Sequence, residues 1–196
     1  RSKTFKNYRA IFQSHTSQVI REQESKGKLS GNTQPMIPEL MKLENISFAY
    51  ETSPVLENLS VAIQEQDFIG LIGPNGSGKS TLLKIMGGIL ESDSGSIQFK
   101  ESPISKINKK LFAQSVSWIS QDHPMVFPFR VSEIVLMGRH PYLSPLSFES
   151  SEDFEICRRA METTMTSQFA DRYFNEISGG EKQRVMIASA LAQNPE

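Results

Sequence analysis

The sequence predicts a mixed α/β domain, and three observations support this. Apolar runs of strand length come first, helix-length patterns follow, and the last helix pattern should lead into another strand. A glycine-rich turn joins one apolar run to a helix. With 196 residues, of which 38% are hydrophobic and 22% charged, the chain suits one domain with a sizeable core and a tail.

The expected strands are apolar runs bounded by turn residues, and the expected helices show helical apolar spacing. The predicted strands span residues 42–50, 59–64, 68–72, 97–100 and 116–120. The predicted helices span residues 80–86, 131–138, 152–165 and 179–193. The strand at 68–72 is expected to be covered on both faces, and the strand at 116–120 to be buried.

Residues 1–40 are polar and rich in Ser, Gln and Lys, unlike the rest of the chain. Four apolar side chains could share one helical face: Phe5, Tyr8, Phe12 and Val19. A basic amphipathic helix at a membrane surface is one interpretation, and a solvated tail or interdomain linker is the favoured one. The predicted organisation is a basic tail or linker at 1–40 and a domain at 41–196.

Charge and composition exclude some classes of protein. A net charge of −1 gives no reason to expect nucleic acid as a partner. The single Cys157 cannot form an internal disulfide, which fits a reducing compartment, and it is expected to be a small residue on a helix face. No apolar run approaches the roughly 18 residues that span a bilayer, so work at a membrane would require docking on partners.

A phosphate-binding loop is predicted where the sequence matches the pattern G-x-x-x-x-G-K-[ST]. Its glycines let backbone N–H groups turn toward phosphate oxygens, and the following helix points its positive end at the same anion. Lys79 offers a point charge to the terminal phosphates, and Ser80 offers a hydroxyl to Mg²⁺. The predicted nucleotide-binding residues are Gly73, Pro74, Asn75, Gly76, Ser77, Gly78, Lys79, Ser80 and Thr81.

A second anion site is predicted at the start of the helix at 179–193. Ser178 is a good N-cap, and Gly179 and Gly180 expose backbone N–H groups. The two anion sites are not expected to serve one phosphate group within one molecule. The economical interpretation is that residues 178–181 bind the terminal phosphate held by the loop of a partner copy.

Together the two motifs make the sequence resemble the ABC ATPases from about residue 41 to residue 196. The usual signature of that family is Leu-Ser-Gly-Gly-Gln, from which Ile177 and Glu181 are mild departures. The resemblance implies a P-loop NTPase cassette of ABC type, with a mixed sheet core, an antiparallel β subdomain and a helical insertion at about 122–177. It also implies ATP and Mg²⁺ as cofactors and a homodimer of ATPase subunits.

Two further residues match the family pattern. Tyr50 corresponds to the aromatic residue that stacks on adenine, with strand packing as the alternative. Gln121 corresponds to the glutamine that reaches Mg²⁺ and the attacking water, with a polar strand end as the alternative. The resemblance therefore implies Gln121 and Lys79 as catalytic side chains, Ser80 and Gln121 as Mg²⁺ ligands, and Glu181 as part of the signature.

Two other family elements are expected beyond residue 196, so the cassette is expected to be C-terminally incomplete. They are an aspartate–glutamate pair on the next strand and a later switch histidine. Glu196 precedes that strand and is not the catalytic glutamate, so the 196 residues alone should hydrolyse ATP negligibly. The histidines His15, His123 and His140 lack metal-ligand spacing, and surface or loop roles are expected for them.

Residues 135–143 and the Pro-Phe-Arg-Val sequence at 128–131 resemble importers of iron-siderophores, haem and vitamin B12, although Arg130 replaces a usual polar residue. This implies a peripheral motor subunit at the cytoplasmic face of the cell membrane. Its partners would be transmembrane permease subunits and, indirectly, a substrate-binding protein. The alternatives are a soluble non-transport ABC ATPase and a nucleotide-binding regulatory module without turnover; residues 121–178 are too few for the coiled coil of many soluble members.

Overall fold

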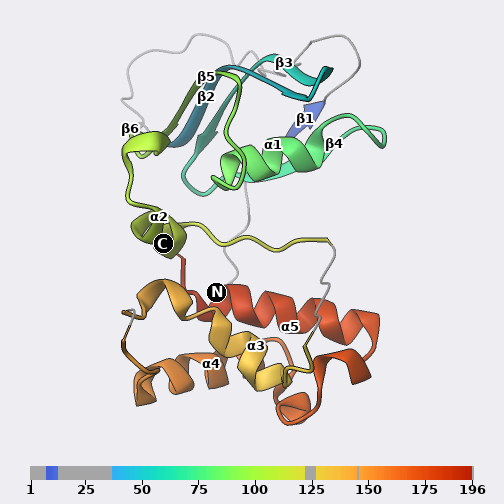
Figure 1. Ribbon diagram of the computed structural model, residues 1–196, viewed down its shortest axis with the longest axis vertical. Coiled ribbons are helices and arrows are strands. Elements are labelled where there is room, and N and C mark those ends of the chain that lie inside the picture. The colour runs from blue at the N-terminus through green and yellow to red at the C-terminus, as the bar shows by residue number, and fades with distance from the viewer. Residues whose placement is uncertain (1–7, 13–36, 122–126, 145, 196) are drawn as a thin grey trace, which may run out of the picture. The chain divides into compact units, whose positions relative to one another are not determined.

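A computed structural model describes residues 8–12, 37–121, 127–144 and 146–195 (Figure 1). The chain divides into two compact units, Arg1–Ile107 and Asn108–Glu196, which are described one at a time. The predicted boundary near residue 40 stays a prediction.

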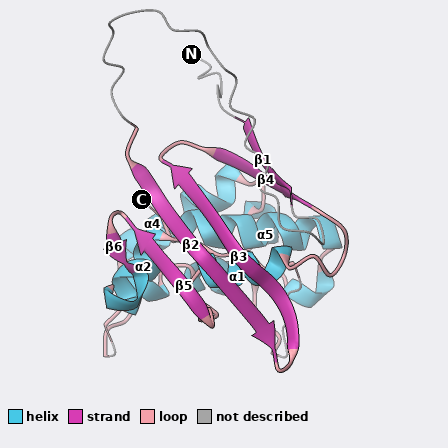
Figure 2. Cartoon of the chain, turned by 90° about the horizontal axis from the view of Figure 1, so that it is seen from above, coloured by secondary structure: helices cyan, strands magenta, loops and turns pink. Residues whose placement is uncertain are grey.

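An antiparallel sheet of four strands dominates the first unit, in the order β3-β2-β5-β6 (Figure 2). Its strands are β2 (Glu39–Tyr50), β3 (Ser53–Gln64), β5 (Ser94–Phe99) and β6 (Ser102–Pro103). On β2, Met41 and Leu43 point into the core two residues apart, as a strand requires. Asn45, with φ of 52°, lies at a shift in register, after which Ile46 continues the buried side.

The phosphate-loop strand and its helix belong to the same unit. The remaining elements here are β1 (Tyr8–Phe12), β4 (Phe68–Ile72), α1 (Lys79–Met86) and a short 3₁₀ turn, η1 (Ile104–Lys106). β1 and β4 pair in parallel, so the interpretation of residues 5–19 as a helix is wrong for Tyr8 and Phe12. The prediction that β4 is covered on both faces is also wrong, because Phe68 and Ile72 are 58% and 52% exposed.

The second unit is helical. Its elements are α2 (Lys109–Ser115), α3 (Val131–Met137), η2 (His140–Tyr142), α4 (Ser151–Thr163), η3 (Ser167–Phe169), η4 (Phe174–Glu176) and α5 (Gly179–Ala192). α3, α4 and α5 pack on one another (Figure 1). Their buried apolar residues include Val131, Ile134, Val135, Cys157, Met161, Val185 and Ala188.

The structure confirms the four predicted helices to within two residues at each end. The predicted strand at 116–120 is wrong: these residues are assigned to no strand and Ile119 is 38% exposed. A strand needs a neighbouring strand for its backbone N–H and C=O groups, and none of the described strands pairs with this segment. The helix α2, which begins after the N-cap Asn108, is not among the predicted elements.

Within the described ranges, no helix is both long and apolar enough to cross a bilayer. Those same ranges contain no group of three or more His, Cys, Asp and Glu side chains arranged to hold a metal ion.

Candidate functional site

The phosphate loop curves around the ammonium group of Lys79. Nζ of Lys79 donates to the carbonyl oxygens of Gly73, at 2.8 Å, and Pro74, at 2.6 Å, and to the hydroxyl of Ser77 at 3.3 Å. Ser77 and Thr81 are buried, whereas Ser80 is exposed in the first turn of α1. The lysine charge and the exposed hydroxyl therefore meet at one end of the helix.

Two glycines of the loop adopt backbone conformations that L-residues avoid. Gly76 and Gly78 both have φ of 82°. A Cβ at Gly78 would also lie 2.9 Å from Cδ2 of Leu56 and 3.0 Å from Cγ1 and the carbonyl oxygen of Val55, whereas nothing lies within 4 Å of a Cβ at Gly76. Position 78 thus requires glycine for its conformation and for its close approach to β3.

The start of α1 has the features of an anion site. No acidic residue lies in its first turn, and unbonded N–H groups and the helix dipole favour a negative ligand there. Lys79 adds a full positive charge. The hydroxyl oxygen of Ser80 is the kind of hard donor that Mg²⁺ accepts, so the residues present fit a phosphate with its metal ion.

Tyr50 lies at the end of β2 and is 47% exposed. Its ring packs edge-to-face on the ring of Phe48, with 4.9 Å between centroids. Phe48 pairs across the sheet with Leu56, the residue that closely approaches Gly78. These contacts bring the hairpin end of β2 and β3 beside the start of α1, and they leave Tyr50 with ring surface open to a ligand.

The predicted second anion site lies at the N-terminus of α5, which we call the signature helix. Ser178 is its N-cap, and Ser178, Gly179 and Gly180 are exposed. Nothing lies within 4 Å of a Cβ built at either glycine. Packing within the chain therefore does not require these glycines, and they keep the helix end open to a group from outside.

Glu181 completes a capping box at this helix. Its Oε2 accepts from the backbone N–H and from the hydroxyl of Ser178, both at 2.7 Å. These bonds, led by the one from the Ser178 hydroxyl, lower the pKa of the Glu181 carboxyl. The signature helix thus begins with an ionised carboxylate where the usual family residue is neutral.

The predicted site residues fall into two sets. Tyr50 and the loop at 73–81 belong to the first unit, and each is close to the start of α1. Gln121 and the signature at 178–181 belong to the second unit, where Gln121 is exposed.

A cavity of about 270 Å³ lies in the second unit beside α3 and η2. Four apolar side chains line it, Phe129, Leu136, Met137 and Leu143, together with Glu133, His140 and Glu149. His140, for which a surface or loop role is expected, lies at the start of η2 and lines this cavity.

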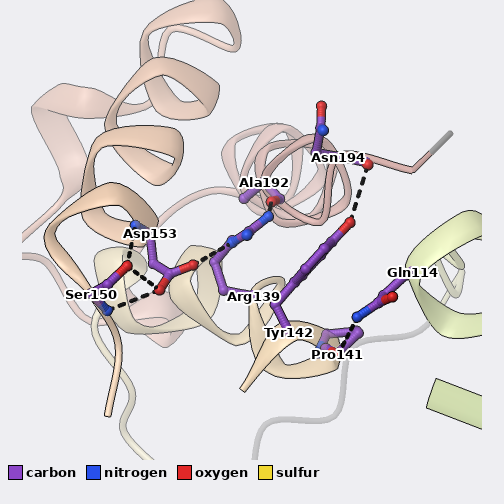
Figure 3. A network of polar contacts seen from close by, with 8 residues as sticks. All are labelled: Gln114, Arg139, Pro141, Tyr142, Ser150, Asp153, Ala192 and Asn194. Atoms are coloured by element: carbon purple, nitrogen blue, oxygen red, sulfur yellow. Dashed lines mark hydrogen bonds and ion pairs between the residues drawn. The ribbon is translucent and has the colours of Figure 1, made fainter. Parts of the chain in front are cut away.

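Arg139, which has no predicted role, forms a buried ion pair (Figure 3). Nε of Arg139 donates to Oδ1 of Asp153 at 2.8 Å, and both side chains are at most 10% exposed. The Arg139 hydrogen bond, followed by bonds from Ser150, lowers the pKa of Asp153 to about 2. The Ser-x-x-Asp pattern at 150–153 could have indicated the cap of α4, but not the arginine that faces it.

The fold and the phosphate loop define a class of nucleotide-binding cassettes. The family model described as ABC transporter matches residues 56–196, and the chain belongs to this family. Its mixed α/β fold, with an antiparallel sheet beside a phosphate-loop strand and helix, is the fold of ABC cassettes.

Two relatives and one solved structure illustrate the similarity. The chain is 35% identical over 156 residues to the iron(3+)-hydroxamate import ATP-binding protein FhuC of Bacillus subtilis, covering 80% of this chain and 58% of FhuC. It is 35% identical over 139 residues to the cobalamin import ATP-binding protein BtuD of Halobacterium salinarum, covering 71% of this chain and 34% of BtuD. A dimeric ATP-binding cassette in a post-hydrolysis state, bound to ADP and Pi, superposes with a TM-score of 0.69 at 26% identity, covering 79% of this chain and 70% of that one.

The chain spans between about a third and three fifths of the length of these two relatives, 34% of BtuD and 58% of FhuC.

Proposed function

We propose that this chain is the ATP-binding and ATP-hydrolysing motor subunit of an ABC importer. The observation that carries the proposal is the ammonium of Lys79, held inside a glycine loop at the start of α1. A positive charge enclosed by backbone at a helix N-terminus suits the terminal phosphates of a nucleotide.

In this proposal the first unit binds ATP. Lys79 holds the terminal phosphates, the face of the Tyr50 ring stacks on the base, and Ser80 is a ligand of Mg²⁺. The metal ion would neutralise phosphate charge during hydrolysis. Gln121 would orient the attacking water and provide a further oxygen ligand for the metal.

Hydrolysis further requires two copies of the chain. The open N-terminus of the signature helix suits the terminal phosphate bound by another copy, because Gly179 and Gly180 let that phosphate approach the backbone. The dimeric cassette bound to ADP and Pi supports this arrangement, since the similarity to it covers 79% of this chain. Closure of the dimer on ATP would drive the transport step.

We further propose that a transmembrane permease docks on the second unit, at the cavity beside α3 and near Gln121. Its apolar wall suits an apolar side chain of the partner, and Glu133 and Glu149 would favour a basic residue next to it. The chain would then be peripheral, at the cytoplasmic face of the membrane. FhuC and BtuD, named for iron(3+)-hydroxamate and cobalamin import, support a ferric siderophore or cobalamin as cargo. Haem is a third candidate, from the resemblance of residues 128–131 and 135–143 to its importers.

Binding of Mg-ATP to the full-length protein tests the central assignment. Lys79→Ala should weaken binding by about 1.5 to 3 kcal/mol, because a charge-assisted contact is lost. The matched control is Lys84→Ala, which removes an equal charge from the last turn of the same helix. If both variants weaken binding of Mg-ATP equally, or if neither weakens it, the role of Lys79 is contradicted.

Crosslinking in the assembled transporter tests the docking surface, and uptake tests the cargo. Photocrosslinkers at Met137 and Leu143 should capture a permease subunit, whereas capture only through residues 1–20 would contradict the docking site. Vesicles containing the transporter should take up one compound from a panel of ferric siderophores, haem and cobalamin. Uptake of none of them would contradict the importer branch.

A further inference from the structure

We propose that Arg139 is a positioning residue that joins the wall of the cavity to the C-terminal end of the signature helix. Binding of a partner at the cavity would then displace the helix and its anion site. The inference rests on the proposed function, because it connects the permease-docking cavity to the helix that contacts nucleotide. The additional element is a mechanical link, within the second unit, between the docking cavity and the signature helix.

Arg139 contacts three elements at once (Figure 3). Its Nε donates to Asp153 on α4, its Nη1 donates to the carbonyl oxygen of Ala192 at 2.9 Å, and its guanidinium lies 3.9 Å from the centre of the Tyr142 ring. Ala192 is the last residue of the signature helix, where carbonyl groups have no partner within the helix and a cation is favoured. The arginine thus links α4 and η2 directly to the end of α5.

The geometry requires the planar fork of arginine. Separate nitrogens bond Asp153 and Ala192 while the flat face of the group stacks on Tyr142. A lysine ammonium could form one or two of these contacts, but has no planar face to stack. Asp153 is held in turn by the backbone N–H and hydroxyl of Ser150, at 2.9 and 2.7 Å, so the counter-charge has a fixed position.

Two further contacts fasten the end of α3 to the signature helix next to this ion pair. A Cβ at Gly138 would lie 2.2 Å from the carbonyl oxygen of Ser189, so only glycine permits the observed approach of the two backbones. The hydroxyl of Ser189 also donates to the carbonyl oxygen of Ile134 at 3.0 Å. With Arg139, these contacts hold the last turn of α5 at several points.

The fastened segment is also the wall of the cavity. Met137 and His140, on either side of Arg139 in sequence, line the cavity, whereas Arg139 itself is 7% exposed and faces the interior. Gln114 of α2 donates to the carbonyl oxygen of Pro141 at 2.9 Å, which fixes η2 from its other side. A partner that presses on the cavity therefore moves residues bonded to α5. The 14-residue helix, about 21 Å long, would transmit that movement to its other end.

A purely structural ion pair would stabilise the second unit without affecting communication between its two ends. The two roles differ in what weakening the ion pair does to a variant that still folds. Weakening a structural pair lowers only the temperature of unfolding, whereas weakening a positioning pair also uncouples cargo from ATP hydrolysis.

The test uses the complete transporter in vesicles, with Arg139→Lys and Asp153→Asn as variants. The measurements are ATPase activity with and without cargo, affinity for ATP, and the unfolding temperature. Both variants should lower the stimulation by cargo by about 2- to 30-fold, with affinity for ATP unchanged. The matched controls are Glu155→Gln and Arg158→Lys, which weaken an exposed ion pair on the same helix and should leave stimulation unchanged.

Folded variants with normal stimulation by cargo would overturn the proposal. Hydrogen exchange of the wild-type complex decides the matter if the variants do not fold. Trapping ATP should protect residues 178–182 and also change exchange at 139–143, because coupling between two sites is reciprocal. Protection at 178–182 alone would overturn the inference and leave the proposed function intact, whereas no effect of ATP at 178–182 would overturn both.

Discussion

Replacing each of two loop glycines by alanine should separate backbone strain from steric conflict. Gly76 and Gly78 have the same φ of 82°, so alanine at either position pays a similar conformational cost, about 1 to 2 kcal/mol. Alanine also restricts the unfolded chain, which returns about 0.4 to 1 kcal/mol. The net loss of stability for Gly76→Ala should therefore be about 0 to 1.5 kcal/mol.

Gly78→Ala carries an additional cost because of its neighbours on β3. Its Cβ would meet Leu56 Cδ2 at 2.9 Å, and the carbonyl oxygen of Val55 at 3.0 Å. The leucine methyl can rotate away, but the carbonyl belongs to the backbone of β3, which is held by the pairs on either side of Val55, at Pro54 and Leu56. Crowding of this kind costs about 1 to 3 kcal/mol, so Gly78→Ala should lose about 1 to 4.5 kcal/mol in total.

Urea unfolding of the full-length protein measures both losses of stability, and ATP titration measures how tightly the loop binds nucleotide. Gly78→Ala should weaken ATP binding more than Gly76→Ala does, because residue 78, which the crowding displaces, directly precedes Lys79 at the start of α1. If the two variants have the same midpoint in urea and the same affinity for ATP, the close approach of Gly78 to β3 does not affect the loop, and the predicted steric cost at position 78 is wrong.

Three further predictions concern other sites. Tyr50→Ala should weaken ATP binding by about 1 to 3 kcal/mol and Tyr50→Trp should retain it, because a ring face stacks on the base; equal fluorescence titrations for alanine and tyrosine would rule stacking out. Asp153→Asn should destabilise the full-length protein by about 3 to 5 kcal/mol at neutral pH, because Arg139 would remain buried without its counter-charge. The lowered pKa of Asp153, about 2 against an ordinary 3.8, means that its stabilisation is complete above pH 4 and is lost as the pH falls toward 2; thermal unfolding should show the wild type and the variant converging there. Residues 1–196 alone should release phosphate negligibly, because the family resemblance leads us to expect the glutamate that accepts a proton from water after the strand that follows the signature helix. Robust turnover that Lys79→Ala abolishes would contradict this.

Local patterns predicted the parts of the molecule that local forces determine. The glycine spacing of the phosphate loop reflects φ values that few other residues adopt, and the structure has Gly76 and Gly78 in that conformation. The helix at 179–193 was predicted with Ser178 as its N-cap, and the structure has Ser178 in that role. Each of these features depends on neighbours within a few residues in sequence.

The errors concern features that depend on distant residues. Residues 116–120 have the composition of a strand, but a strand forms only where another strand accepts its hydrogen bonds. The exposure of Phe68 and Ile72 likewise depends on what packs against β4, which their own sequence does not specify. No local pattern indicates the ion pair of Arg139 and Asp153, because only tertiary packing buries both side chains and brings their charges together.

The same distinction applies to Glu181, which the sequence analysis treated as a mild change from glutamine. Its carboxylate is bonded to Ser178 and its pKa is lowered, so a negative charge lies at the helix end that is proposed to receive a partner's phosphate. The charge caps the helix and also repels the phosphate. Glu181→Gln can keep the cap, since glutamine also accepts from Ser178, and it removes the repulsion.

Glu181→Gln should therefore strengthen ATP-dependent dimerisation of the full-length protein, and the gain should shrink as salt screens the charge. Sedimentation at a series of ATP and salt concentrations measures both effects. Glu176→Gln is the matched control, because it removes an equal, exposed charge from the turn before the signature helix. If Glu176→Gln strengthens the dimer as much, the effect is one of net charge; if neither variant does, the phosphate does not approach the helix end at Glu181.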